Sequence, residues 1–500
     1  MKQYLLLIIL TTFSVTLFSQ NEEEIPEMSI QKKDVETHLR YLASDELKGR
    51  DTGKPGGDTA AVYIANQFEK FGLQQVEGAD GWFQKVPFQM VQPAQSGELI
   101  FGKDKYNIGD NLLIINGNPL DIEANAIFAG HGWVNEETGH DDYKDLNVKG
   151  KVVFLLPGNP ESNHPFSAFQ AMPEKRKIAA EKGAVAVIEL FRLNFPWGYF
   201  KNFMNEAKLT IGSDDKMVNA MTYGWLKEES KEAVASLSKG EKMRVKLNSP
   251  GAVSTPVFSN NVIGMVAGTN PNLQEEYLIL TAHYDHVGVD KKAAEGQDSI
   301  FNGARDNGMG VVALLSAAKT LAEKPAARPT VFLAVTAEER GLLGSKYYVN
   351  NPLIPLEKTI FNLNNDGGGY NSTEHAAIIG YGRTGTDAEI QQSVEPFGLK
   401  VAENPMPDEN LFDRSDNVNF AIKGIPSIDF APGALSFDAE VTKYYHQVVD
   451  EADSIDYDYL LKFCQAYARA ARLIADKETL PVWTEGDKYE AAGKVLYKKE

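Results

Sequence analysis

From residue 261 onward, apolar runs that are long enough for buried strands alternate with segments of helical apolar spacing. The sequence predicts strands at residues 277–282, 330–336, 358–363 and 425–430, and helices at residues 309–322 and 457–475. Strands that read as continuous apolar runs are typical of a mostly parallel sheet with both faces covered by helices. The predicted fold class is therefore α/β, and ligands are expected beyond the carboxyl ends of the strands.

The pattern changes between about residues 96 and 254, where short β-branched runs are separated by many turn residues. Strands are predicted at residues 126–129, 151–156 and 185–190, with a helix at residues 172–182. The histidines of this region, His131, His140 and His164, stand among turn residues without a partner at a fixed spacing, which favours surface positions. We expect a separate β-rich lobe, inserted into the catalytic domain, none of whose strands joins the catalytic sheet.

Two further helices are predicted near the amino terminus, at residues 35–42 and 59–71, on either side of the glycine-rich segment 51–58. That segment lacks the Gly-Lys-Ser/Thr ending of a phosphate-binding loop. We therefore interpret it as a turn.

The first residues have the pattern of a secretory signal peptide. Lys2 precedes the apolar run Tyr4–Leu10, and small and polar residues then lead to the acidic run that follows Gln20. Threonines and a serine interrupt the apolar stretch, which makes it a poor membrane span. We expect an exported protein, periplasmic or secreted, with no stable membrane association after signal cleavage; the alternative is an uncleaved anchor.

Charge and cysteine content limit the classes of possible partner and the possible cellular compartments. The 50 basic and 69 acidic residues give a net charge of −19, which repels phosphate backbones and disfavours nucleic acid as a partner. The single cysteine, Cys464, excludes an intrachain disulfide and a thiolate metal cluster. Export without disulfides fits a bacterial periplasm or a secreted bacterial enzyme.

Residues of metal-ligand type gather where the predicted strands end. In chain order they are His283, Asp285 and His286 after the first strand, Asp306 before a helix, Glu338 and Glu339 after the second strand, Asp366 after the third, and His446 in a loop after the last. One such residue alone is more often a helix cap or a turn residue. Several at the same end of one sheet indicate a site.

Metal chemistry accounts for these residue types. A catalytic zinc binds imidazole nitrogen and carboxylate oxygen at about 2.0–2.2 Å and keeps one position open. Even two histidines and three carboxylates from this set are too many ligands for one such ion. They suit two zinc ions roughly 3.5–4 Å apart, bridged by one carboxylate. Of Glu338 and Glu339, one can ligate while the other takes a proton from water. Asp285 can accept the proton on the other ring nitrogen of His283 and so fix its tautomer.

These segments also carry a family resemblance. Five of them, in the same order, resemble the zinc metallopeptidase family of bacterial leucyl aminopeptidases and glutamate carboxypeptidase: Ala282–Gly288, Gly303–Gly308, Ala337–Ser345, Asn364–Asp366 and Tyr445-His446. Leu42–Arg50 is similar to the amino-terminal segment of that family, so the resemblance covers roughly residues 35–75 and 255–475. Asp141–Val153 resembles the protease-associated domain that is often inserted in it.

The resemblance implies a role for each residue. One zinc ion would be held by His283, Asp306 and Asp366, and the other by Asp306, Glu339 and His446, with Asp306 as the bridge and Glu338 as the general base. His286 would not be a ligand. The implied function is that of a zinc-dependent exopeptidase, most specifically an aminopeptidase, which hydrolyses amino-terminal peptide bonds with water activated by two metal ions.

Three more residues are candidate substrate-binding groups. Tyr445 could donate to a developing oxyanion or serve as an aromatic packing residue. Asp416 stands in the segment Ser415-Asp416-Asn417, where many members of the family have Ser-Asp-His. Arg383, like Arg414, could bind a free carboxylate. Gly367–Gly369 replaces the bulky apolar residues that commonly follow the aspartate, so a different pocket shape is expected.

Alternatives to an aminopeptidase are open. A carboxypeptidase or dipeptidase would use the same two-zinc site. A non-catalytic, receptor-like binding protein would keep the fold but lose ligands, and no ligand position is lost here. A glutaminyl cyclase uses one zinc, which the full ligand set disfavours, and a serine hydrolase is disfavoured because there is no Gly-x-Ser-x-Gly segment.

The predicted organisation follows from these observations. It assigns residues 1–19 to a signal peptide, 20–95 together with 255–480 to a two-zinc peptidase domain of α/β class, 96–254 to an inserted protease-associated domain, and 481–500 to a tail. Two zinc ions are the expected cofactors, and peptides are the expected substrates. The oligomeric state and the side-chain preference are left open.

Overall fold

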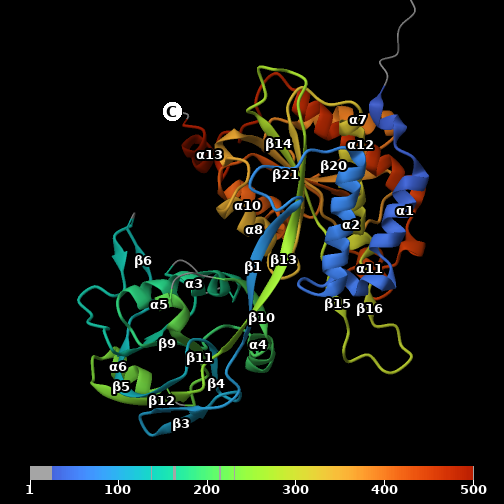
Figure 1. Ribbon diagram of the computed structural model, residues 1–500. Coiled ribbons are helices and arrows are strands. Elements are labelled where there is room, and N and C mark those ends of the chain that lie inside the picture. Colours follow the sequence, from blue (N-terminus) through green and yellow to red (C-terminus); the bar gives the residue numbers. More distant parts are fainter. Residues whose placement is uncertain (1–24, 137, 161–164, 213–215, 230, 499–500) are drawn as a thin grey trace, which may run out of the picture.

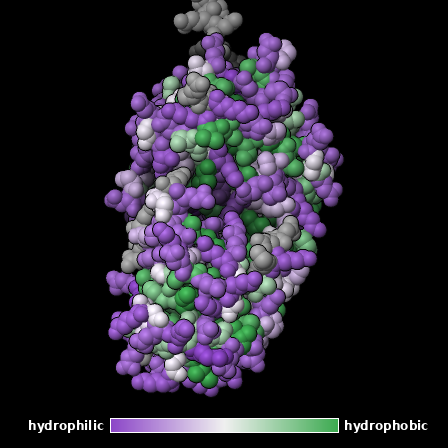
Figure 2. Space-filling model, turned by 90° about the vertical axis from the view of Figure 1, so that its left-hand side faces the viewer, coloured by the Kyte–Doolittle hydropathy of each residue, from purple (hydrophilic) through white to green (hydrophobic). Residues whose placement is uncertain are grey.

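The chain forms two lobes, each built around its own sheet (Figure 1). The computed structural model describes residues 25–136, 138–160, 165–212, 216–229 and 231–498, so the expected signal peptide lies outside the described residues. Within those ranges no helix combines the length and the apolar character needed to cross a membrane. The face in Figure 2 is mostly hydrophilic, with scattered apolar patches and a hollow near its middle.

The larger lobe contains a nine-stranded sheet in the order β10-β1-β13-β17-β14-β18-β21-β19-β20. The strands are β10 (Lys208–Ile211), β1 (Phe83–Gln92), β13 (Val253–Val266), β17 (Thr330–Val335), β14 (Tyr277–His283), β18 (Thr359–Asn364), β21 (Ser427–Pro432), β19 (His375–Ile379) and β20 (Lys400–Glu403). The four central strands β17, β14, β18 and β21 run parallel, while β13 and β19 are antiparallel to their inner neighbours. The α/β class with a mostly parallel centre is confirmed.

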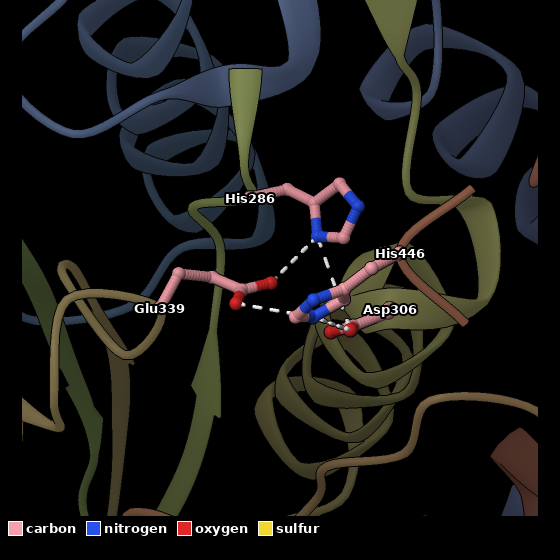
Figure 3. A group of neighbouring side chains, drawn as sticks. All are labelled: His286, Asp306, Glu339 and His446. Atoms are coloured by element: carbon pink, nitrogen blue, oxygen red, sulfur yellow. Dashed lines mark hydrogen bonds and ion pairs between the residues drawn. The ribbon is translucent and has the colours of Figure 1, made fainter. Parts of the chain in front are cut away.

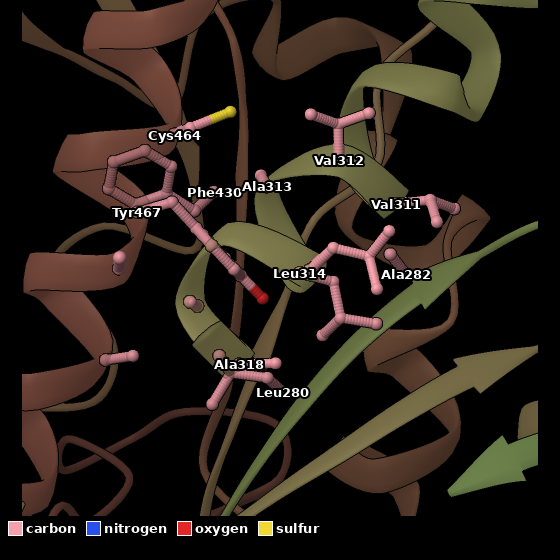
Figure 4. Packing of buried hydrophobic residues seen from close by; sticks show 14 of the residues in the cluster. Leu280, Ala282, Val311, Val312, Ala313, Leu314, Ala318, Phe430, Cys464 and Tyr467 are labelled. Carbon is pink, nitrogen blue, oxygen red and sulfur yellow. The ribbon is translucent and has the colours of Figure 1, made fainter. Parts of the chain in front are cut away.

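Helices cover both faces of this sheet. One face carries α1 (Lys32–Leu42), α2 (Pro55–Phe71), α7 (Met309–Glu323), α9 (Asp387–Val394) and α12 (Tyr457–Asp476), and the other carries α8 (Leu343–Asn350), α10 (Asn417–Ile422) and α13 (Glu490–Leu496). Successive strand residues point to opposite faces, so Leu280 packs with α7 and α12 (Figure 4), whereas Ile279 packs with α8 and α10.

Helix α7 lies in the middle of this packing. Twelve of its fifteen residues are buried, because it is held between the sheet and α12 (Figure 4). A helix that is apolar on all sides is a core helix. Its amino-terminal end, which follows Asp306, is therefore fixed by contacts on every side.

The smaller lobe contains an eight-stranded sheet in the order β3-β2-β12-β5-β8-β9-β11-β4. The strands are β2 (Glu98–Phe101), β3 (Asp104–Asn107), β4 (Leu112–Asn116), β5 (Leu120–Phe128), β8 (Val152–Leu155), β9 (Ala186–Leu190), β11 (Thr222–Leu226) and β12 (Met243–Ser249). Helix α6 (Glu232–Ser238) covers one face, and α3 (Pro165–Glu181) and α4 (Trp197–Met204) cover the other. Each face has its own apolar cluster, as expected for an independent core.

One strand departs from the prediction that no strand of residues 96–254 joins the catalytic sheet. β10 pairs antiparallel with β1, from Phe88 opposite Ile211 to Val91 opposite Lys208. The reason is the length of β1 and β13, which extend beyond the rest of the sheet toward the smaller lobe (Figure 1). Without β10, this part of β1 would be an open edge with unpaired main-chain groups.

A buried ion pair stabilises the smaller lobe. Lys175 of α3 lies 2.8 Å from Glu189 of β9, and both side chains are 0% exposed. Replacing Glu189 with alanine should destabilise the protein by about 3–5 kcal/mol, because the ammonium group of Lys175 would stay buried without its partner. The urea midpoint, followed by tryptophan fluorescence to which buried Trp225 contributes, measures this.

The matched control is Glu123→Ala in the same lobe, since Glu123 pairs with Arg244 where both side chains are more than half exposed. Exposed pairs contribute little, so the midpoint should hardly move. Equal shifts in the two variants would contradict the role assigned to the buried pair.

Candidate metal centre

The structure brings the five predicted ligands together at the carboxyl ends of the central strands. His283 is the last residue of β14, Glu339 follows β17, and Asp366 follows β18. Asp306 lies in the tight turn Ala304–Gly308 before α7, and His446 lies in the loop between α11 (Ala439–Tyr444) and α12. Parallel strands end at one edge of a sheet, which explains how residues up to 163 positions apart (446 minus 283) converge.

The first group consists of His283, Asp306 and Asp366. Nε2 of His283 lies 3.1 Å from Oδ1 of Asp366 and 3.4 Å from Oδ1 of Asp306. The ligand atoms of this group all lie within 4.8 Å of one another. That spacing leaves room for one cation at their centre.

The second group consists of His286, Asp306, Glu339 and His446 (Figure 3). Nε2 of His446 lies 3.1 Å from Oδ2 of Asp306 and 3.2 Å from Oε2 of Glu339. Nδ1 of His286 lies 2.7 Å from the other oxygen, Oε1 of Glu339. Asp306 thus offers Oδ1 to the first group and Oδ2 to the second, which is the arrangement that a bridging carboxylate requires.

Electrostatics favour a cation at this place. Three carboxylates meet in a largely buried space, and isolated buried charges are costly unless they are paired. Although burial opposes a charge on His283, the carboxylates of Asp366 and Glu338 raise its pKa well above the usual value. Although burial acts in the other direction, hydrogen bonds from His286 and His446 lower the pKa of Glu339. The carboxylates therefore attract positive charge, and the residues present fit a metal ion.

Glu338 lies beside both groups and belongs to neither. It lines the same pocket as four of the five predicted ligands, and burial raises its pKa well above the usual value. Its main-chain N–H donates to Oδ1 of Asp285 over 3.1 Å. Glu338 is thus a carboxyl group next to the proposed metal ligands with an affinity for protons, as a general base needs.

Asp285 takes a different position from the one expected. Nδ1 of His283 lies 3.2 Å from the main-chain carbonyl of Asp285, whereas the carboxylate is 3.8 Å away, too far for a hydrogen bond. The carboxylate accepts instead from Glu338 and from the hydroxyl of Thr52 at 3.0 Å. The expected contact to His283 is therefore made by the main chain, and the Asp285 side chain positions Glu338.

A pocket opens beside the two groups. Apart from the predicted ligands and Glu338, its lining is mainly small and apolar: Gly367–Gly369, Ala377, Ile379, Met406, Leu411, Arg414, Ser415, Asp429, Ala431, Pro432, Ala434, Phe437, Val441 and Tyr445. Tyr445 stacks on His446 with ring centroids 4.2 Å apart. A Cβ atom on Gly368 would lie 2.2 Å from Cδ2 of Tyr445, so the glycine run lets the tyrosine ring close against the main chain.

Two candidate substrate-binding residues lie elsewhere. Arg383 forms an ion pair with Asp487 at 2.7 Å, stacks over Phe412, and does not line the pocket. Asp416 is fully buried, is bound by the hydroxyl of Ser345, and does not line the pocket either. Both assignments to substrate contact are corrected. The sequence around Arg383 and the sequence around Asp416 do not reveal that a residue far away in the chain binds the charged group.

Two supporting residues were missed by the sequence reasoning. Asp429 in β21 accepts hydrogen bonds from the main chain of Asp366 at 2.9 Å and from Asn364 at 3.1 Å; its place near a strand end was a usable signal. Arg50 is 1% exposed and donates to the main-chain carbonyls of Tyr284 and Gly303. It ties the amino-terminal segment Leu42–Arg50 to the loops that carry His283 and Asp306.

Comparisons with known proteins point to peptide hydrolysis. Residues 261–471 match the family described as Peptidase family M28. The chain is 26% identical over 348 residues to "Aminopeptidase YwaD" of Bacillus subtilis (strain 168), covering 69% of this chain and 67% of that protein. It is 34% identical over 145 residues to "Vacuolar membrane protease" of Saccharomyces cerevisiae (strain YJM789), but spans only 13% of that protein's length.

Among solved structures, the "Aminopeptidase from Aneurinibacillus sp. strain AM-1" is similar in fold. The alignment has a TM-score of 0.55 and 21% sequence identity, and covers 91% of this chain and 98% of that one. At this identity the comparison supports the fold, including its extent over almost the whole chain.

Proposed function

We propose that this chain is a zinc-dependent aminopeptidase with two zinc ions, because residues 261–471 match peptidase family M28. His283, Asp306 and Asp366 would hold one ion, and Asp306, Glu339 and His446 would hold the other. The observation that supports this best is the position of Asp306, which gives one oxygen to each group. His286 would act on Glu339 through its hydrogen bond and not as a ligand.

Zinc ions at these positions would polarise the peptide carbonyl and lower the pKa of water to about 7. Glu338 takes the proton from the attacking water and returns it to the leaving amine, so one carboxylate serves first as base and then as acid. Asp285 holds the main chain of Glu338 during this transfer. The phenol of Tyr445, whose pKa is raised by burial and by nearby carboxylates, stays protonated and can donate to the oxyanion.

The charge of the site decides which end of a peptide it accepts. Carboxylates surround the reacting centre, and they favour a cationic amino terminus over an anionic carboxyl terminus. Arg414, the only lysine or arginine that lines the pocket in the described part of the chain, is the residue that favours the carboxypeptidase alternative. Its Nη1 lies 3.9 Å from the carboxylate of Glu409, too far for a hydrogen bond, and donates instead to the main-chain carbonyl of Glu409 at 3.5 Å, so its other N–H groups could bind a substrate carboxylate.

Amino-acid 4-nitroanilides should be cleaved, and their N-acetylated forms should not, because acetylation removes the positive charge and fills the space beside the carboxylates. Release of 4-nitroaniline measures both rates directly. Peptides with a free and with an amidated carboxyl terminus serve as the matched control, and both should lose their amino-terminal residue at similar rates. Equal cleavage of the acetylated compounds, or release from the carboxyl end only, would overturn the aminopeptidase assignment.

The same proposal covers the cellular location of the protein and the identity of the smaller lobe. The signal-peptide pattern of residues 1–19 supports export to the periplasm or beyond the cell. The separate eight-stranded sheet supports the interpretation of residues 96–254 as an inserted protease-associated domain, with β10 as its contact to the catalytic sheet.

A further inference from the structure

The loop that carries His446 also holds the turn that carries Asp306. This loop, residues 444–450, is closed by hydrogen bonds from Gln447 N to Tyr444 O at 2.9 Å and from Asp450 N to Gln447 O at 3.1 Å. Asp450, at its end, is 1% exposed. One compact loop therefore presents His446 to the proposed metal centre and a buried carboxylate to the neighbouring turn.

Asp450 binds this turn at several points. Its carboxylate accepts from the main-chain N–H of Arg305 at 2.9 Å and of Asp306 at 3.3 Å, and its own carbonyl accepts from Ala304 N at 3.1 Å. The guanidinium of Arg305 adds an ion pair at 3.1 Å. These contacts fix the main chain at the residue whose side chain would bridge the two ions.

Arg305 completes the connection on the other side of the loop. Its guanidinium carbon lies 3.5 Å from the centre of the Tyr444 ring, and its nitrogens donate to the hydroxyl and the carbonyl of Ser454. The side chain is 3% exposed, so these contacts are largely shielded from solvent. The loop and the turn are thus joined through Tyr444, through Asp450 and through the 3.1 Å approach of His446 to Asp306.

His446 needs such support. Its φ is +53°, in the left-handed region, which costs a non-glycine residue of order 1–3 kcal/mol unless its surroundings hold it. The side chain of His446 is 36% exposed and cannot be held by burial alone. The connections through Tyr444 and Asp450 provide the support from both ends of the loop.

We propose that Arg305 and Asp450 are positioning residues, which lock the Asp306 turn to the His446 loop so that the shared metal position is formed before an ion arrives. This inference rests on the proposed two-zinc site. Neither residue belongs to a ligand group or lines the pocket; each acts through Asp306 and His446. Loss of such supporting contacts typically weakens metal binding by about 10- to 100-fold.

The test measures zinc affinity, by competition with a chromogenic chelator, in the full-length wild type and in Asp450→Asn. The amide keeps the size of the side chain but replaces one acceptor by a donor that faces the N–H groups of the turn. One of the two dissociation constants should rise about 10- to 100-fold, whereas the other changes less. Glu189→Gln is the matched control, a buried carboxylate in an ion pair of the smaller lobe; it should lower the melting temperature and leave both constants unchanged.

Two further variants make the outcome decisive. In a His446→Ala background, Asp450→Asn should add little to the loss of affinity, because both changes act on the same position. If Asp450→Asn does not fold, Ser454→Ala removes only one acceptor of Arg305 and should raise the same constant by several-fold. Unchanged zinc constants in folded Asp450→Asn or Ser454→Ala would overturn the inference, whereas a wild type that binds no zinc would overturn the proposed function itself.

Discussion

Replacing Glu338 with glutamine should lower kcat for an amino-acid 4-nitroanilide by about 10²- to 10⁴-fold, because the amide cannot accept the proton of the attacking water. The side chain keeps its size and lies outside both ligand groups, so the zinc content should stay at the wild-type value. Steady-state kinetics together with metal analysis of the same sample measures both quantities.

The adjacent residue provides the contrast. Glu339→Gln should lose zinc from the position shared with His446, because Oε2 of Glu339 lies 3.2 Å from Nε2 of His446 in the second group. Activity returns in part if zinc is added in excess. If Glu338→Gln loses metal and Glu339→Gln retains it, the roles of base and ligand have to be exchanged.

Removing the metal should abolish activity completely. A strong chelator is expected to reduce hydrolysis to the background rate, and zinc added after dialysis should restore it, with two ions bound per chain at full activity. Inductively coupled plasma mass spectrometry counts the ions. A fully active protein with no bound ion, or with only one, would contradict the two-zinc proposal.

Resistance to the chelator should fall as the pH is lowered. Although burial opposes its charge, hydrogen bonds to Asp306 and Glu339 raise the pKa of His446 to about 10 when no ion is bound. Zinc must then displace a proton from this imidazole, so protons compete with the metal below that pKa. Affinity at this position should therefore decrease by about tenfold for each unit by which the pH is lowered. A zinc affinity that does not change with pH would show that zinc does not displace a proton from His446. His446 would then not be a ligand.

The sequence predicts the fold to a large extent because the signal is local. Buried strands such as residues 277–282 and the apolar helix at residues 309–322 are continuous patterns, and both appear within two residues of the predicted bounds. The convergence of the five ligand candidates could be predicted because the carboxyl ends of parallel strands meet at one edge of the sheet. This rule depends on topology alone.

The contacts that the sequence does not predict are those between side chains far apart in the chain. Arg383 is engaged by Asp487, which lies 104 positions later, and no local pattern marks that pair. The same holds for Asp450 and Arg305, which are separated by 145 positions. The carboxylate of Asp285 was expected near His283, but a difference of less than 1 Å decides between the main-chain carbonyl and the side chain, and spacing cannot resolve such a difference.

The long ribbon of β1 and β13 has a consequence for how the two lobes relate. The chain enters the smaller lobe after Gln92 and returns at Val253, and these two residues are direct partners at the end of a ladder of ten antiparallel pairs. Opposite residues in such a ladder lie only about 4.5–5.5 Å apart, which is the distance that a two-residue hairpin closes. The whole intervening segment could therefore be lost or acquired in a single genetic event without a gap in the catalytic sheet. The smaller lobe is in this sense an enlarged hairpin turn, and the protein is modular although β10, from the inserted segment, is hydrogen-bonded to β1 of the catalytic sheet.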